Sequence, residues 1–116
     1  MPYLKMYRSI KHLNYIRKKA CLISQQYESQ ACHIRILSDG GTGLKPSDYC
    51  VLPFNYYYHK MQTDIGELTF YKKFNINPYE FAIFYAINSP CKKITKEHIE
   101  YLKERKSVYE RLHQNR

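Results

Sequence analysis

The stretch that decides the fold is ACHIRILSDGGTGLKPSDYCVLPFNYYYHKMQTDIGE, residues 31–67. It begins with a strand-like apolar run at 31–37, and a polar loop leads to a second short run, 49–52, which the following proline should end. From Asn55, a residue type that caps helices, the pattern becomes helical to about residue 62. The stretch therefore predicts the order strand, loop, strand, helix.

The flanking segments add further elements to this unit. Upstream, residues 3–19 are predicted to form a basic helix, or a helix plus an extended arm. The run Cys21-Leu22-Ile23 is predicted to pair antiparallel with 31–37, because only a polar connector separates the two runs. Downstream, helices are expected over about 67–74, 79–87 and 96–113. This pattern is typical of an α+β protein with a small hairpin core followed by helices.

The charge of the chain favours a polyanionic partner. Its 116 residues, enough for one domain, carry 19 Lys and Arg against 10 Asp and Glu, a formal net charge of +9. The first twenty residues hold six of these basic residues and no acid: Lys5, Arg8, Lys11, Arg17, Lys18 and Lys19. Nucleic acid is the default partner for such an excess. The alternative is an ordinary basic protein from an AT-rich genome, in which Lys, Asn, Ile and Tyr accumulate.

The hydropathy pattern points to the cytoplasm. No apolar run approaches the ~20 residues of a membrane span, and the first residues lack the apolar stretch of a secretion signal. In the cytoplasm the four cysteines should be reduced, and because they form no CxxC pair they do not favour a zinc ribbon.

Two histidines sit where chemistry could be organised. His33 lies on the first strand of the decisive stretch and His59 lies on its helix. Histidines on a hairpin and on the following helix can hold one divalent metal between them, and a strand histidine beside that metal can take a proton from water. The pattern therefore favours metal-assisted hydrolysis. The alternative is a hydrogen-bonded strand histidine and a histidine on the helix surface.

The motif order resembles a phage-type subfamily of HNH (ββα-metal) endonucleases, similar to RecA-dependent recombination nucleases. The resemblance rests on Cys-His-Ile-Arg at 32–35, Gly-Leu-Lys-Pro-Ser-Asp at 43–48, Val-Leu-Pro-Phe at 51–54, His59 and Ile-Gly-Glu at 65–67. It implies a ββα-metal core in an HNH-like domain at 20–90, preceded by a basic arm or helix at 1–19 and followed by a C-terminal helix at 91–116.

The resemblance also assigns roles to individual residues. It implies that His33 is the general base, that Asp48 takes the place of the asparagine that orients this base, and that Cys32 and His59 are metal ligands. The position of a second helix ligand, one turn after His59, holds Thr63, a poor ligand. With Asp48 or Asp64 as substitute ligands, the metal is left open as Mg²⁺, Mn²⁺ or Zn²⁺.

The implied partner is DNA, with a recombination protein as a further partner, and no membrane. The residues expected to contact DNA are Arg35, Lys45, Arg17, Lys18 and Lys19. Three functions stay open: a metal-dependent DNA endonuclease or nickase derived from a phage, a catalytically inactive HNH scaffold that binds DNA, and a small basic protein-interaction adaptor.

Other side chains are given structural or solvated roles. The Gly-rich loop at 40–43 has no Gly-Lys-Ser/Thr continuation, so it is not a P-loop, and it is expected to supply flexibility near DNA. Four tyrosines are expected either to stack on bases or to pack in the core, and packing is favoured: Tyr56, Tyr57, Tyr58 and Tyr71. Mostly buried positions are expected at Phe81, Phe84, Tyr85 and Ile87, and solvated ones at His12, His98 and His113.

Overall fold

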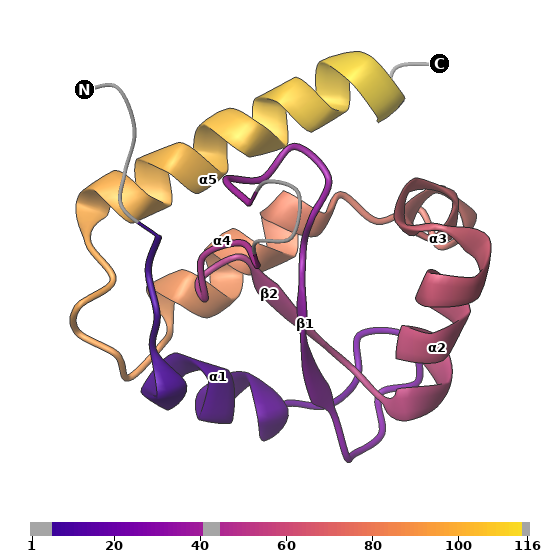
Figure 1. The fold of residues 1–116 in the computed structure, drawn as a ribbon, viewed down its shortest axis with the longest axis horizontal. Coiled ribbons are helices and arrows are strands. Elements are labelled where there is room, and N and C mark those ends of the chain that lie inside the picture. Colours follow the sequence, from indigo (N-terminus) through magenta and orange to yellow (C-terminus); the bar gives the residue numbers. More distant parts are fainter. Residues whose placement is uncertain (1–5, 41–44, 115–116) are drawn as a thin grey trace.

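The computed structural model describes residues 6–40 and 45–114. Within them the chain is an α+β protein with two antiparallel strands and five helices, the α+β class that the sequence predicts. The hairpin of β1 (Gln30–His33) and β2 (Val51–Phe54) crosses the middle of the molecule, with α1 (Ile10–Arg17) on one side and α2 (Tyr56–Ile65) on the other (Figure 1). No helix in the described part of the chain is long and apolar enough to cross a membrane.

The pairing of the hairpin corrects one prediction. β1 pairs with β2, with His33 opposite Val51, whereas the run Cys21-Leu22-Ile23 forms a turn instead of a strand. β2 also continues through Pro53 instead of ending before it. The Leu22 amide donates to the Pro53 carbonyl at 3.0 Å, but proline has no N–H for the return bond, so a ladder cannot form on that edge.

The helices from α2 onward begin after residues that favour helix capping, and α2 ends at a glycine. The Asn55 side chain caps α2 by accepting from the Tyr58 amide, and Gly66, with φ of 95°, lets the chain turn directly into α3 (Glu67–Lys73). Asn77 caps α4 (Pro78–Ile87) and Thr95 caps α5 (Lys96–Tyr109), which continues as a π-helical turn over Glu110–Gln114.

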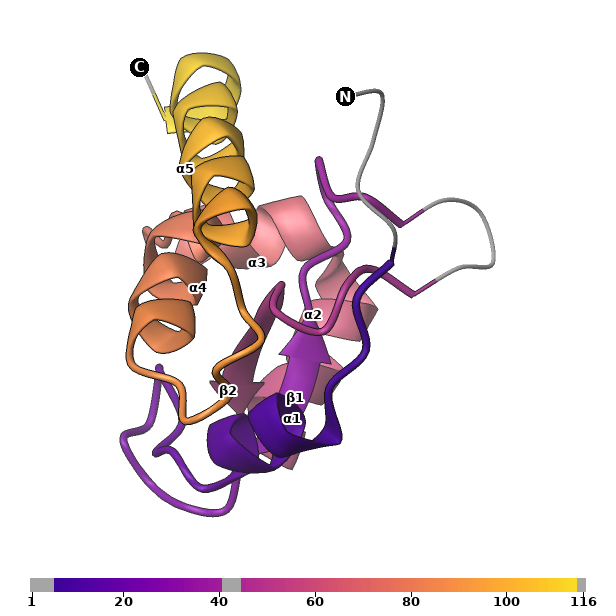
Figure 2. The same ribbon diagram turned by 90° about the vertical axis from the view of Figure 1, so that its left-hand side faces the viewer.

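Aromatic side chains fill much of the core. Tyr49, Tyr71 and Tyr79 are almost completely buried, and the Tyr79 hydroxyl donates to the Ile36 carbonyl at 2.6 Å. α4 packs against both β2 and α5, and these two helices lie together beside the hairpin in Figure 2. Phe84 and Ile87, expected to be mostly buried, are more than half exposed. The reason is the helical period, which turns the face that carries the buried alanines and tyrosines of α4 inward and these two residues outward.

His12 corrects the expectation of a solvated histidine. Its side chain is fully buried on α1, and its Nδ1 lies 2.8 Å from the Ser89 hydroxyl. His98 is half-buried and stacks on Tyr49, with ring centroids 4.6 Å apart, and His113 is half-buried against Tyr109. These histidines contribute aromatic surface to the packing of the interior.

Burial of His12 predicts a loss of stability in acid. Desolvation, only partly opposed by Asp48, lowers the pKa of His12 from 6.5 to about 4. Between these values the unfolded chain binds a proton that the folded chain does not, so the free energy of unfolding should fall by roughly 3 kcal/mol as the pH drops through this window. Urea unfolding at several pH values measures the slope.

A His12→Gln variant is the control for this slope, because glutamine can still reach Ser89 but does not titrate. Burial also lowers the pKa of His33, His59 and His98, so the variant should reduce the pH dependence without removing it. An unchanged slope in His12→Gln would show that another group carries the effect.

Candidate functional site

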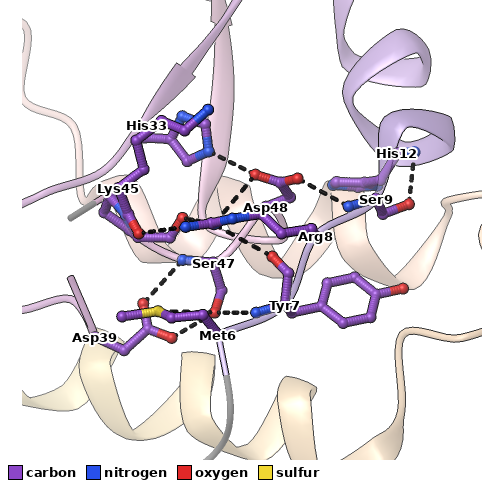
Figure 3. Close-up of polar contacts among 11 residues, drawn as sticks. Met6, Tyr7, Arg8, Ser9, His12, His33, Asp39, Lys45, Ser47 and Asp48 are labelled. Carbon is purple, nitrogen blue, oxygen red and sulfur yellow. Dashed lines mark hydrogen bonds and ion pairs between the residues drawn. The ribbon is translucent and has the colours of Figure 1, made fainter.

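A histidine–aspartate pair lies where the loop after β1 returns to the hairpin. His33, the last residue of β1, places Nε2 2.8 Å from Oδ1 of Asp48 (Figure 3). Asp48 is only 3% exposed, and its other oxygen accepts from the Ser9 amide at 2.8 Å. Because an ionised carboxylate only accepts, the pair requires His33 to donate from Nε2, which leaves Nδ1 as the basic nitrogen of a neutral ring.

The Lys-Pro-Ser-Asp run, residues 45–48, is held by contacts with distant segments. Asp39 binds Ser47 twice, accepting from its amide at 2.9 Å and from its hydroxyl at 2.5 Å, and so closes the base of the loop. The Ser47 hydroxyl also accepts from the Tyr7 amide, and the Asp48 amide donates to the Tyr7 carbonyl. In Figure 2 residues 6–9, the N-terminal segment of the described chain, pass beside this loop before entering α1. The segment therefore fixes Asp48 against His33.

Cations surround the pair at the protein surface. The Arg8 guanidinium donates to the carbonyls of Pro46 at 2.6 Å and Lys45 at 2.9 Å, and Nη1 lies 3.6 Å from Asp48 Oδ1. Burial lowers the pKa of His33; Asp48 raises it, and the charges of Lys45 and Arg8 lower it further. His33 is consequently neutral near pH 7, so its free nitrogen can accept a proton or a hydrogen bond.

A cleft of about 390 Å³ opens beside this pair, between β1 and α2. Its walls are formed by Ala31, Cys32, His33, Arg35, His59, Gln62, Thr63, Gly66 and Glu67. His33 and His59 thus line one cleft from separate elements. His59 is held by Gln30, whose Oε1 lies 2.5 Å from His59 Nδ1, and this contact marks one end of the cleft.

The other end of the cleft is organised by Glu67, a residue to which no functional role was given from sequence. One carboxylate oxygen accepts from the Arg35 amide at 2.9 Å and the Tyr71 hydroxyl at 2.8 Å, and the other accepts from the Ile36 amide at 3.0 Å. Burial raises the pKa of Glu67, opposed by these three donors. The contacts tie the chain leaving β1 to the start of α3. The Gly66-Glu67 pair that follows α2 is the feature of the sequence that could have pointed to Glu67.

The donor set of the cleft does not fit a resident divalent metal. Among the described residues no group of three His, Cys, Asp or Glu side chains is arranged to hold one. Cys32 is 3% exposed, its thiol donates to the Gln30 carbonyl, and burial raises its pKa to about 12, which opposes the thiolate that a metal needs. The Thr63 hydroxyl is bound to the His59 carbonyl. Of the expected ligands, His59 alone remains suitable.

The other acidic residues considered as substitute ligands are engaged elsewhere. Asp64 is exposed on α2 and pairs with Lys60 at 3.0 Å, whereas Asp48 is bound by His33 and Ser9. A catalytic metal usually has about three protein ligands.

The basic residues expected to contact DNA fall into two groups. Arg35 lines the cleft, and Lys45 is exposed close enough to His33 to lower the pKa of its ring. Arg17, Lys18 and Lys19 lie at the end of α1 and do not line the cleft; Lys19 is placed over the Tyr15 ring at 4.7 Å. The Gly-rich loop lies, apart from Gly40, outside the described residues, as does Lys5.

The four tyrosines also divide into two kinds. Tyr71 is 1% exposed in the core and Tyr58 is partly buried, as the packing interpretation requires. Tyr56 and Tyr57 are 66% and 63% exposed on the first turn of α2. Packing therefore accounts for only half of this set.

No protein-family model, no curated protein and no solved structure matches this chain. The interpretation of the site consequently rests on its own geometry.

Proposed function

We propose that this protein binds DNA through the cleft between β1 and α2, on a ββα scaffold of the HNH nuclease type whose metal-binding half has been lost. The observation that carries the proposal is the His33–Asp48 pair with Arg8 and Lys45 beside it and Arg35 in the adjoining cleft. Cations on one rim attract phosphate oxygens, and a neutral histidine among them can hydrogen-bond the same backbone.

The order of elements supports the scaffold part of this proposal. A strand that ends at His33, an antiparallel partner and a helix that carries His59 follow one another along the chain, and the two histidines line one cleft. Among the residues that the structure describes, no three His, Cys, Asp or Glu side chains are grouped to hold a metal, and His59 is the one expected ligand that remains suitable. We therefore propose binding without a resident metal.

A salt titration of DNA binding tests the proposal. Fluorescence anisotropy with labelled oligonucleotides of unrelated sequence should give similar affinities. The logarithm of the binding constant should fall linearly with the logarithm of salt concentration, with a slope of about −0.9 for each duplex phosphate contacted. Binding that is absent at low salt, or that ignores salt, would contradict the proposal and favour a protein-interaction adaptor, including one that binds a recombination protein.

Phosphodiester hydrolysis, as in an endonuclease or nickase, is a second candidate function. The observation that favours it is the orientation of His33, because a carboxylate on Nε2 leaves a neutral Nδ1 able to take a proton from water. The donor set of the cleft weighs against it, so we rank hydrolysis below binding.

Nicking of supercoiled plasmid with Mg²⁺, Mn²⁺ or Zn²⁺ separates the two candidates. We expect no nicking by the natural chain. We expect Thr63→His to raise Zn²⁺ affinity in calorimetry, because it places a second imidazole one turn from His59. If the natural chain does nick plasmid, and His33→Ala lowers the nicking rate roughly 10²–10⁴-fold, hydrolysis with His33 as the general base would be established. His59→Ala is the control that removes the remaining ligand.

A further inference from the structure

The cleft has two chemically different ends. At one end are His33, Arg35 and the bound carboxylate of Glu67, with Lys45 close to His33. At the other end the Gln30–His59 contact joins the start of β1 to α2. β1 and α2 therefore run in the same direction along the cleft, and the residues that precede Gln30 and His59 lie at the end away from its cations.

Exposed tyrosines lie next to this second end, Tyr56 on the first turn of α2 and Tyr27 on the segment before β1. Tyr56 precedes His59 by three residues on α2, which puts it on the same side of the helix as His59 and Thr63 and about 4.5 Å further along the axis. Tyr27 precedes Gln30 by three residues on the segment that leads into β1. They are 66% and 70% exposed, so neither ring contributes to the core.

The two tyrosines also belong to one end of the fold. The turn before Tyr27 contacts the start of α2, because the side-chain amide of Asn55, the residue before Tyr56, donates to the Ser24 hydroxyl at 3.2 Å. The Leu22 amide binds the Pro53 carbonyl in the same region. These contacts hold the backbone before Tyr27 against the backbone at the start of α2, so both exposed rings project from ordered backbone.

We propose that the Gln30–His59 end of the cleft is a subsite for unpaired bases, with Tyr56 and Tyr27 as stacking surfaces, and that the protein prefers single-stranded DNA. This inference rests on the proposed DNA binding at the other end of the cleft. A strand whose phosphates lie along Arg35 and Lys45 carries its next bases toward these tyrosines. In a duplex the bases are already stacked and paired, so the rings cannot reach their faces.

Binding of three labelled DNAs of equal length tests the subsite. These are an oligothymidine strand, an abasic strand with the same phosphates, and a duplex. The oligothymidine strand should bind more tightly than the abasic one, and Tyr56→Leu should weaken it about 5- to 140-fold, which corresponds to stacking of about 1–3 kcal/mol per base. Tyr56→Leu should leave the abasic strand unaffected, and Tyr27→Leu should act in the same direction.

Tyr57→Leu is the matched control. Tyr57 is equally exposed on the same helical turn, but it lies about 100° around the axis, and its ring packs edge-on against Tyr58 at 4.9 Å. This variant should bind all three DNAs like the natural chain, and Tyr56→Phe should retain the affinity for oligothymidine.

Two outcomes would overturn the inference, and they differ in what they leave standing. If the abasic and oligothymidine strands bind equally, or if Tyr56→Leu and Tyr27→Leu change neither, the base subsite is wrong while phosphate binding stands. If none of the three DNAs binds at low salt, the proposed function fails together with the inference.

Discussion

Replacing Asp48 with alanine is expected to lower the free energy of unfolding by about 2–6 kcal/mol, roughly 1–3 kcal/mol for each of two buried donors that lose their acceptor. The carboxylate is buried, and its two oxygens hold the Ser9 amide and the His33 ring at 2.8 Å each. Removing it leaves both donors without an acceptor inside the protein and takes away one of the contacts between the start of α1 and the loop beside His33. A domain of this size has a total stability of roughly 5–15 kcal/mol, so the loss is a large fraction of it.

Urea unfolding followed by circular dichroism measures this loss. Asp64→Ala is the control, because Asp64 is exposed and its surface pair with Lys60 on α2 should contribute little to stability. If Asp48→Ala were as mild as this control, the buried pair would not hold the N-terminal segment.

Asp48→Asn keeps the prediction measurable if the alanine variant does not fold. An asparagine oxygen can accept from Ser9, but its amide then faces His33 as a donor. His33 must become an acceptor at Nε2 and carry its proton on Nδ1. Nitrogen NMR of the ring should show this change of tautomer, and an unchanged tautomer would contradict the assignment of the pair.

The strand–strand–helix order could be predicted from the sequence because its signals are local. Asn55 caps α2, Gly66 ends it, and the Asn77-Pro78 pair opens α4, and each effect depends on a few neighbouring residues. Strand pairing depends on residues far apart in the sequence. The run at 21–23 looked like a strand by composition, but the missing N–H of Pro53 prevents a ladder there.

Parts of the site could not be predicted for the same reason. Ser9 and Tyr7 hold residues 47 and 48 through backbone groups, which carry no signature in the sequence. The basic N-terminal segment suggested an arm that binds DNA, but Arg8 is bound to carbonyls beside the His33–Asp48 pair. In the sequence His12 could not be distinguished from a surface histidine, because its burial depends on tertiary packing.

The metal ligands illustrate the difference between residue type and environment. Thr63 was a poor ligand by its chemistry alone. Cys32 was a plausible ligand by type, yet its burial and its bond to the Gln30 carbonyl disfavour the thiolate. Sequence reasoning could therefore place the histidines on the right elements without determining whether a metal site exists.

Reversing the charges of the cleft, with the double variant Arg35→Glu and Lys45→Glu, is expected to weaken DNA binding roughly tenfold or more at low salt. Both side chains are exposed, Arg35 lines the cleft, and Lys45 lies close to the His33 ring. Each phosphate contact removed should reduce the magnitude of the salt slope by about 0.9 on duplex DNA and about 0.7 on a single strand. Anisotropy titrations at several salt concentrations measure both effects.

The control for this variant is Lys92→Glu with Lys96→Glu, which changes the net charge by the same amount. Both lysines are exposed near the start of α5, on the opposite side of the molecule from α2 in Figure 1. A general attraction between a +9 protein and a polyanion would be weakened equally by the two double variants. Binding in the cleft requires the Arg35 and Lys45 variant to lose affinity and salt slope while the control keeps its slope, because only the first pair lies where the phosphates are proposed to sit. Equal losses in both variants would show that the protein binds DNA through its charge alone.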